Sequence, residues 1–280
     1  MSRVGIDDFR RWKREGQRFT CLTAYDAPTA RILARSDVPL LLVGDSLGNV
    51  LLGYRDTIPV TMEEMLHHTR AVRRGAPEAF IVGDMPFLSY QVSVEEAVRN
   101  AGRFLKEGLA DAVKVEGGTP RLSTVRHLLD AGIPVMGHLG LTPQSATLLG
   151  GHRVQGVQAE QAAELRREAQ ALAEAGIFAL VLECVPREVA RAITESIEVP
   201  TIGIGAGPDC DAQILVTPDL LGYESEYKPR FVRRYAEIEK MIGEAVKRFS
   251  DDVTRGEYPS DEESFHMPSE ELDRWRRTGE

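Results

Sequence analysis

Short apolar runs alternate with amphipathic segments along most of the chain. Eight of these runs are rich in valine, isoleucine and leucine, as expected for parallel strands that are buried on both faces. They cover residues 19–25, 39–45, 80–86, 112–118, 134–140, 179–185, 200–207 and 213–219. Between them, segments such as 62–72 repeat apolar side chains every three or four residues, which places those side chains on one face of a helix.

This alternation of strand and helix predicts a parallel sheet. Because about eight units fit, a closed (β/α)₈ TIM-type barrel is favoured over the alternative, an open doubly wound sheet. A short helix at 7–16 should precede the barrel, 158–175 should form a long alanine-rich helix, and 229–249 a final amphipathic helix. No helix fits between the last two strands. Thr61 with Glu64, and Ser93 with Glu96, have the spacing of capping boxes at two helix starts.

We therefore expect one catalytic barrel domain over residues 1–250. Residues 251–280 are highly charged and should form an extension that packs on the surface or is partly disordered.

Composition narrows the class of protein. The formal net charge of -9 argues against nucleic acid as a partner, since phosphate binding needs a basic surface. Three scattered cysteines without a CxxC motif predict a reducing, cytoplasmic location. We find no apolar signal core at the start and no run long enough to predict a membrane span.

Acidic side chains follow three successive predicted strands: Asp45, Asp84 and Glu116. In a barrel, the groups at the carboxyl ends of the strands form the active site. Taken singly, Asp45 or Asp84 could equally cap a turn. Together the three form an all-oxygen set, which suits Mg²⁺.

Other polar residues at strand ends keep two interpretations each. Lys114 and Glu116 point to the same side of a strand, so they form either a buried ion pair or a site for an anionic substrate beside a metal. Glu183 is either a solvated or paired acid or a base whose pKa burial has raised. His138 is either a satisfied core histidine or a contact at the barrel rim.

The alternating Gly203, Gly205 and Gly207 indicate either tight backbone packing or room for a ligand, and they lack the spacing of a dinucleotide motif. Histidines at 67, 68, 152 and 266 have no metal spacing and are interpreted as surface residues.

A series of segments resembles the ketopantoate hydroxymethyltransferase family, in the family's order. They are residues 23–28, 42–48, 68–77, 84–87, 113–118, 137–145, 180–186, 202–207 and 211–216, with a looser match near 256–265. One departure is Ala212, where the family usually has glycine, and it puts the detail of the donor pocket in question.

The resemblance implies a (β/α)₈ barrel enzyme of pantothenate and coenzyme A synthesis. Its reaction moves a hydroxymethyl group from 5,10-methylenetetrahydrofolate, or a related pterin, to 3-methyl-2-oxobutanoate through a Mg-stabilised enolate, giving 2-dehydropantoate. Members are typically homo-oligomers, often decamers.

The resemblance also assigns roles to individual residues. Asp45 and Asp84 bind Mg²⁺, or another divalent cation, directly and contact the keto acid, while Glu116 holds the metal through water. Ser46 and Lys114 bind the keto acid.

The same resemblance makes Glu183 the general base. His138 lies in a matching segment and is grouped with the substrate-binding residues, with its role left open.

Two alternatives compete with this function. A Mg²⁺-dependent lyase or mutase of the phosphoenolpyruvate/pyruvate-barrel type would share the acids, but the sequence offers neither a reactive cysteine nor a phosphate clamp. A non-enzymatic barrel gives no reason for acids at three successive strand ends.

Overall fold

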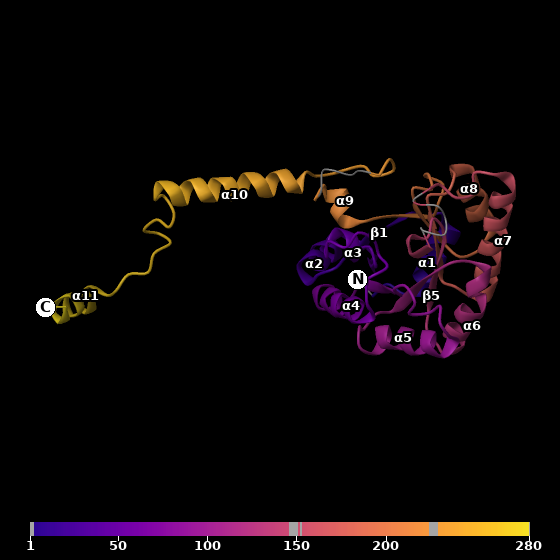
Figure 1. Cartoon of the computed structure of the whole chain (residues 1–280), viewed down its shortest axis with the longest axis horizontal. Helices are drawn as coiled ribbons and strands as arrows, with labels where there is room; N and C mark the ends of the chain where they lie inside the picture. Colours follow the sequence, from indigo (N-terminus) through magenta and orange to yellow (C-terminus); the bar gives the residue numbers. More distant parts are fainter. Residues whose placement is uncertain (1–2, 146–150, 152, 224–228, 280) are drawn as a thin grey trace. The chain divides into compact units, whose positions relative to one another are not determined.

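In the computed structural model, which describes residues 3–145, 151, 153–223 and 229–279, eight parallel strands close into a barrel in sequential order (Figure 1). The strands are β1 Phe19–Thr23, β2 Leu40–Val43, β3 Phe80–Asp84, β4 Ala112–Glu116, β5 Val135–Gly140, β6 Ala179–Glu183, β7 Thr201–Ile204 and β8 Ala212–Leu215. Pairing of Phe19 with Ala212 joins β1 to β8. The predicted barrel is confirmed, and the open doubly wound sheet is wrong.

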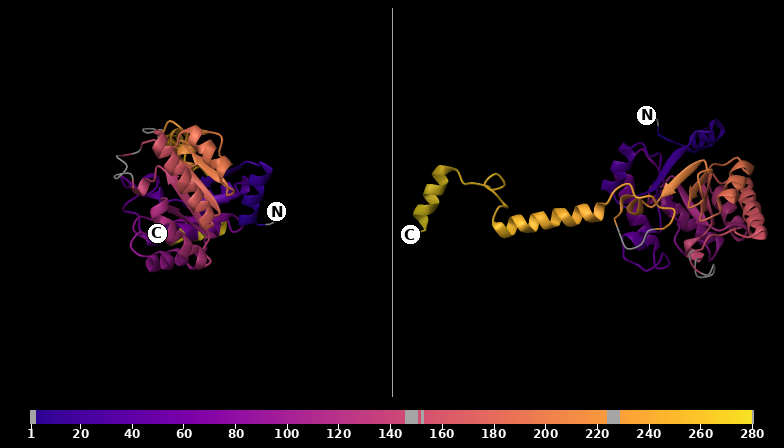
Figure 2. Two further views of the ribbon diagram at one scale, coloured as in Figure 1. Left: turned by 90° about the vertical axis from the view of Figure 1, so that its right-hand side faces the viewer. Right: turned by 90° about the horizontal axis from the view of Figure 1, so that it is seen from above.

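Helices follow the strands and surround the barrel (Figure 2). They are α1 Ile6–Glu15, α2 Ala27–Arg35, α3 Leu47–Val50, α4 Met62–Gly75, α5 Val94–Lys106, α6 Leu122–Asp130, α7 Ala159–Ala175, α8 Arg187–Ser196 and α9 Thr217–Leu221, with 3₁₀ turns η1 Thr119–Arg121 and η2 Pro143–Ser145. As predicted, β7 leads into β8 without a helix between them.

Side-chain caps fix two of the helix starts that the sequence predicted. At α4, Thr61 and Glu64 make both bonds of the capping box. At α5, the Ser93 hydroxyl accepts the backbone N–H of Glu96 at 3.1 Å, which is the N-cap half of the predicted box.

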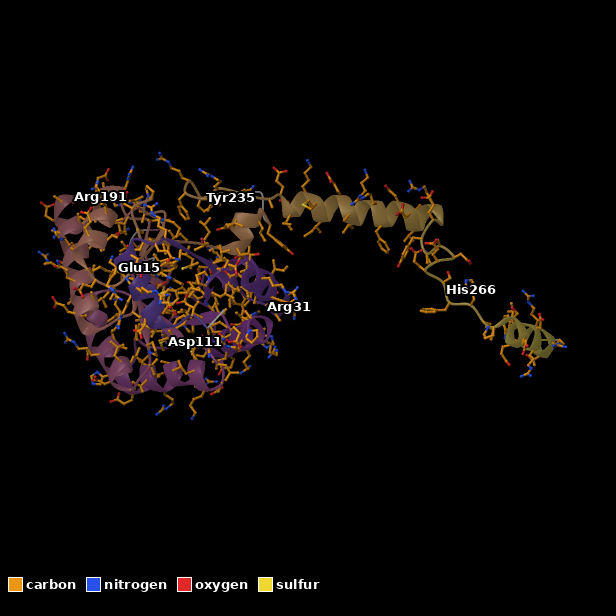
Figure 3. All side chains as sticks on the ribbon, turned by 180° about the vertical axis from the view of Figure 1, so that it is seen from behind. Glu15, Arg31, Asp111, Arg191, Tyr235 and His266 are labelled. Atoms are coloured by element: carbon orange, nitrogen blue, oxygen red, sulfur yellow. The ribbon has the colours of Figure 1, made fainter. Side chains whose placement is uncertain are left out.

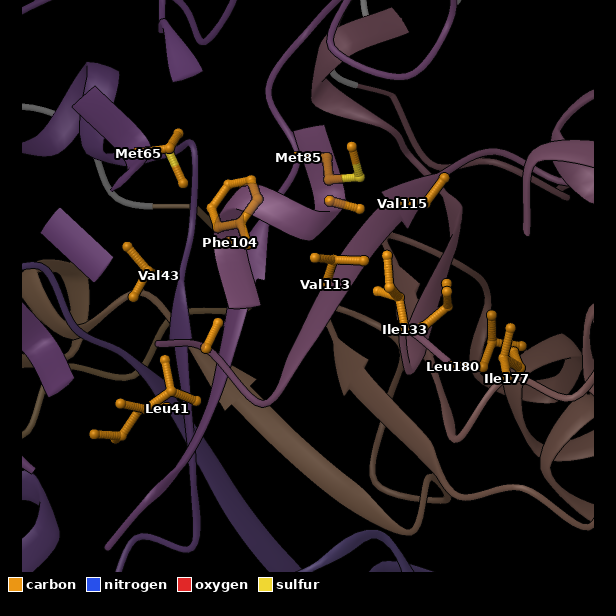
Figure 4. Close-up of a cluster of buried hydrophobic side chains, with 14 of the residues drawn as sticks. Leu41, Val43, Met65, Met85, Phe104, Val113, Val115, Ile133, Ile177 and Leu180 are labelled. Carbon is orange, nitrogen blue, oxygen red and sulfur yellow. The ribbon is translucent and has the colours of Figure 1, made fainter. Parts of the chain in front are cut away.

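Two apolar layers hold the barrel together. The larger lies between the strands and the helices, where β2 and β4 contribute Leu41, Val43 and Val113 and α5 contributes Phe104 (Figure 4). The second fills the barrel interior. Helix α1 closes the end of the barrel at which the strands begin. Its Phe9 packs edge-on against Phe80 of β3, with 5.1 Å between the ring centroids. The leading helix therefore seals the end of the barrel opposite the predicted site.

A second compact unit comprises residues 221–227 and 234–280. It contains α10 Ile238–Arg255 and α11 Ser269–Thr278, and neither helix has a buried side chain (Figure 3). The helix predicted at 229–249 is therefore partly wrong, because it begins nine residues later and ends six residues later. Residues 229–233 belong to the barrel unit instead, where Val232 is buried. The extension at 251–280 stays a prediction.

Within the described ranges, no helix is long and apolar enough to cross a membrane.

Candidate active site

The carboxyl ends of the strands surround a small cavity of about 100 Å³. Its lining includes every site residue that the sequence predicted: Asp45, Ser46, Asp84, Lys114, Glu116, His138 and Glu183. Strand register brings them together, since Asp84 pairs with Lys114 and Glu116 pairs with His138 on the neighbouring strand. Five of the seven are buried, so charges lie at the mouth of the barrel with little access to water.

Lys114 lies among the acids. Its Nζ is 3.0 Å from Asp84 Oδ1, 3.4 Å from Glu116 Oε1 and 3.2 Å from His138 Nδ1. Burial acts to lower the pKa of Lys114, but the charges of Asp84 and Glu116 outweigh it and the pKa is raised. The ion pair that the sequence left open is therefore present, and it extends to a second carboxylate.

Asp45 and Asp84 are adjacent, because the backbone N–H of Asp45 donates to Asp84 Oδ2 at 3.1 Å. Burial, followed by the charges of Asp84 and Glu116, raises the pKa of Asp45 well above its ordinary value. Burial also raises the pKa of Asp84, although Lys114 opposes this. A bound cation would stabilise the ionised form of both acids, because its charge offsets their burial and their mutual repulsion.

The donor set fits a hard cation that needs few protein ligands. Within the part of the chain that the structure describes, no three side chains of aspartate, glutamate, histidine or cysteine are grouped to ligate one ion. Mg²⁺ requires only one or two carboxylates and keeps several water ligands. Asp45 and Asp84 are the candidates for that pair, although Lys114 Nζ contacts Asp84 at 3.0 Å as well as Glu116 at 3.4 Å. Direct ligation by the two aspartates, with Glu116 contacting the cation through water, stays a prediction.

His138 links two acids across the cavity. Its Nδ1 is 3.2 Å from Glu116 Oε1 and its Nε2 is 3.2 Å from Glu183 Oε2. Burial and Lys114 act to lower the pKa of His138, but the nearby carboxylates of Glu116 and Glu183 outweigh them and the pKa is raised. Glu183 is more accessible, with 17% of its side chain exposed. His138 is thus buried and lies beside the predicted base, and its contact with the substrate stays a prediction.

Comparison with known proteins identifies the family. Residues 3–261 match the family model described as ketopantoate hydroxymethyltransferase. The chain belongs to this family.

Two relatives named 3-methyl-2-oxobutanoate hydroxymethyltransferase illustrate the similarity. The one from Moorella thermoacetica (strain ATCC 39073 / JCM 9320) is 54% identical, over 94% of this chain and 98% of the relative. The one from Koribacter versatilis (strain Ellin345) is 56% identical, over 90% of this chain and 85% of the relative. The chain is therefore an enzyme, a hydroxymethyltransferase, and the non-enzymatic barrel is wrong.

Solved structures with the same barrel are more distant. Phosphonopyruvate hydrolase in complex with oxalate and Mg²⁺ is 14% identical with a TM-score of 0.60, covering 100% of this chain and 97% of that chain. The 2,3-dimethylmalate lyase of the PEP mutase/isocitrate lyase superfamily is 16% identical with a TM-score of 0.58, covering 96% and 93%. These likenesses show the fold alone. The choice between the transferase and the lyase or mutase therefore rests on the family match, which favours the transferase.

The structure adds residues that the sequence did not single out. The Tyr25 hydroxyl lies 2.9 Å from Ser46 Oγ, and His68 Nδ1 lies 2.7 Å from the Tyr25 carbonyl oxygen. Interpreting His68 as a surface residue was therefore wrong, because it is half-buried and supports the segment beside Ser46. His67 and His266 are exposed as expected, and the prediction for His152 lies outside the described residues.

Gln144 is the second addition. It is buried and contacts both Asp45 and Glu116. Gln144 lies in segment 137–145, whose resemblance to the family was the sequence feature that could have predicted its role. The residues predicted from strand ends alone were charged residues and histidine, and a neutral amide does not meet that criterion.

The glycines in and directly after β7 allow close packing. A Cβ on Gly203 would meet Cys210 Sγ at 3.0 Å, one on Gly205 would meet Phe231 at 2.8 Å, and one on Gly207 would meet Arg187 at 2.8 Å. Of the two interpretations, close approach is the one observed. Ala212 is buried at the start of β8 in the barrel interior, so its methyl group adds to the core.

Proposed function

We propose that the enzyme transfers a hydroxymethyl group from 5,10-methylenetetrahydrofolate, or a related pterin, to 3-methyl-2-oxobutanoate, giving 2-dehydropantoate for pantothenate and coenzyme A synthesis. Relatives more than 50% identical over most of the chain carry the name of this reaction. The observation that carries the proposal is the buried cluster at the barrel mouth, where acids, a lysine and a histidine surround one small cavity.

Asp45 and Asp84 would hold Mg²⁺ or another divalent cation, with Glu116 contacting it through water. The buried, all-oxygen pair supports this assignment because burial and neighbouring acids raise the pKa values of both carboxyl groups, and a cation would stabilise their ionised form. A bound Mg²⁺ supplies a Lewis acid that polarises the carbonyl group of the keto acid.

Lys114 would neutralise the carboxylate of the keto acid. Its ammonium group already lies between two buried acids, so an anion entering the cavity meets a positive charge that is held in place. The Ser46 hydroxyl, held by Tyr25, would donate a hydrogen bond to the same substrate.

Glu183 would remove the proton from C3 of the keto acid. His138 contacts its Oε2 at 3.2 Å and would keep the carboxylate directed into the cavity. The resulting enolate carbon would form the new C–C bond to the methylene carbon of the folate, both C–N bonds of that carbon would break, and one water would supply the oxygen of the new hydroxyl group. The net reaction consumes one water and releases tetrahydrofolate. A cytoplasmic location and a homo-oligomer, closed by symmetry as a decamer, belong to the same proposal and rest on composition and resemblance.

A product assay tests the proposal directly. Purified protein is incubated with 3-methyl-2-oxobutanoate, methylenetetrahydrofolate and Mg²⁺, and each component is omitted in turn. We expect 2-dehydropantoate by mass spectrometry only in the complete mixture, and its loss after chelation of the metal. Absence of product from the complete mixture, with a correctly folded protein, would contradict the proposed function.

A further inference from the structure

We infer that Gln144 is a positioning residue, whose buried amide orients the carboxylate of Asp45 toward the cavity and thereby sets the affinity for the divalent cation. This inference rests on the proposed function, because it assumes that Asp45 holds a cation. Gln144 itself touches no reacting atom in the proposed chemistry.

Gln144 has all four hydrogen-bonding positions of its amide filled. Its Nε2 donates to Asp45 Oδ2 at 2.9 Å and to the backbone carbonyl oxygen of Met85 at 2.9 Å. Its Oε1 accepts from the Tyr90 hydroxyl at 2.8 Å and from Gln91 Nε2 at 3.2 Å. Since two acceptors face the nitrogen and two donors face the oxygen, only one orientation of the amide satisfies every partner.

The backbone of Gln144 holds a second acid. Its N–H donates to Glu116 Oε2 at 3.2 Å. Gln144 thus contacts one oxygen on each of Asp45 and Glu116 and leaves the other oxygen of Asp45 for a ligand. Met85 directly follows Asp84, so the same amide also supports the end of β3.

Burial makes these contacts consequential. Gln144 is 5% exposed and Tyr90 is 1% exposed, so the network has little access to water. A buried hydrogen bond does not exchange with water, so it holds its two partners in place. Removing one partner leaves a buried acceptor without a hydrogen bond. Groups that orient a metal ligand typically change metal affinity or activity by about 10–100-fold when they are removed.

The test uses the full-length protein and Mg²⁺ as the probe. Calorimetric titration without substrate measures the dissociation constant for wild type, Gln144→Met and the matched control Gln170→Met, which changes a half-buried glutamine on α7. We expect Gln144→Met to bind Mg²⁺ about 10–100-fold more weakly, with the control within about twofold of wild type. At saturating Mg²⁺ and keto acid, kcat should fall less than the Mg²⁺ affinity does, because the reacting groups remain in place.

Tyr90→Phe provides a second variant that keeps the ring packing and removes the hydroxyl, which donates to Gln144 Oε1 at 2.8 Å and accepts the backbone N–H of Glu116 at 3.2 Å. We expect a smaller loss of Mg²⁺ affinity, and a double variant no weaker than Gln144→Met alone, because both act through one network. If Gln144→Met binds Mg²⁺ as tightly as wild type does, the inference is overturned. If Gln144→Met does not fold, the same comparison is made with Tyr90→Phe, and equal affinity again overturns the inference. If wild type itself binds no divalent cation, the proposed metal site fails, and the inference fails with it.

Discussion

At the scale of single residues, Glu183 is the side chain that we propose removes the proton. We predict that the enzyme exchanges the C3 hydrogen of 3-methyl-2-oxobutanoate with solvent in the absence of folate. Glu183→Gln keeps the shape but cannot accept the proton, so exchange should fall by about 10²–10⁴-fold while the keto acid still binds. Proton NMR in D₂O follows the loss of the C3 signal.

The matched control for this variant is Glu188→Gln, an exposed acid in the first turn of α8. It should exchange at the wild-type rate. Wild-type exchange by Glu183→Gln would show that another group is the base, and His138 would be the next candidate because it contacts Glu183 at 3.2 Å.

Asp84 tests the coupling between cation and substrate. Asp84→Asn removes a proposed ligand and also weakens the 3.0 Å ion pair with Lys114. We expect Mg²⁺ and keto-acid affinities to fall together, by about 10-fold or more, because the substrate binds beside both groups. Titration of the keto acid with and without Mg²⁺ measures this. A variant that binds the keto acid normally and independently of metal would contradict the coupling.

At the scale of elements, the start of α4 should make stability depend on pH. The Tyr54 hydroxyl donates to Glu64 at 2.5 Å, and this bond, with those from Thr61, outweighs desolvation and lowers the pKa of Glu64 below 4.5. A lowered folded-state pKa stabilises the fold above the unfolded pKa, and that contribution is lost as pH falls through the folded pKa. Urea unfolding should therefore show a shallower loss of stability below pH 4.5 for Glu64→Gln than for wild type.

Glu95→Gln is the control for this measurement, since Glu95 is exposed in the first turn of α5. Its pH profile should follow that of wild type. Identical profiles for Glu64→Gln and wild type would show that the capping box contributes no pH-dependent stability.

The contact between β3 and α5 depends on a missing side chain. A Cβ on Gly83 would lie 2.3 Å from the fully buried ring of Phe104, whereas one on Gly137 of β5 would meet Ile177 at 3.1 Å. We expect Gly83→Ala to lower the free energy of unfolding by about 1–3 kcal/mol through overpacking, and Gly137→Ala to cost less. Chemical denaturation of both variants measures the difference, and equal losses would contradict it.

At the scale of the whole molecule, the proposed homo-oligomer needs an apolar surface. Along α10, Ile242, Val246, Phe249 and Val253 are spaced by four, three and four residues, and each is 43–57% exposed. Such a stripe is typical of a helix that packs against a partner. We expect Val246→Lys with Phe249→Lys to reduce the molecular mass measured by analytical ultracentrifugation.

The double substitution should leave Mg²⁺ binding unchanged, because the proposed ligands Asp45 and Asp84 lie in the barrel unit. As a control, Glu244→Lys with Lys247→Glu alters charge on the same helix without changing the apolar stripe. If all three proteins have the mass of a monomer, the homo-oligomer is wrong.

The sequence by itself determined the order of the elements and the end of the barrel at which the site lies. Apolar runs and helical periodicity are local properties, so they located all eight strands, the helix that leads into β1 and the capping box at Thr61. Strand ends are also readable locally. Once a closed parallel barrel was expected, Asp45, Asp84 and Glu183 had to lie at one end of it.

Only the tertiary structure decided which of these groups touch. The contacts of Lys114 with Asp84 and His138 depend on register between neighbouring strands, which no single run of residues encodes. Gln144 contacts Asp45 from 99 positions away, and it does so as a neutral residue in a short turn without periodicity. The chain before α10 was likewise decided by packing, since residues 229–233 belong to the barrel unit, where Val232 is buried. Local patterns specify elements, whereas pairing distances and burial arise only when distant segments pack together.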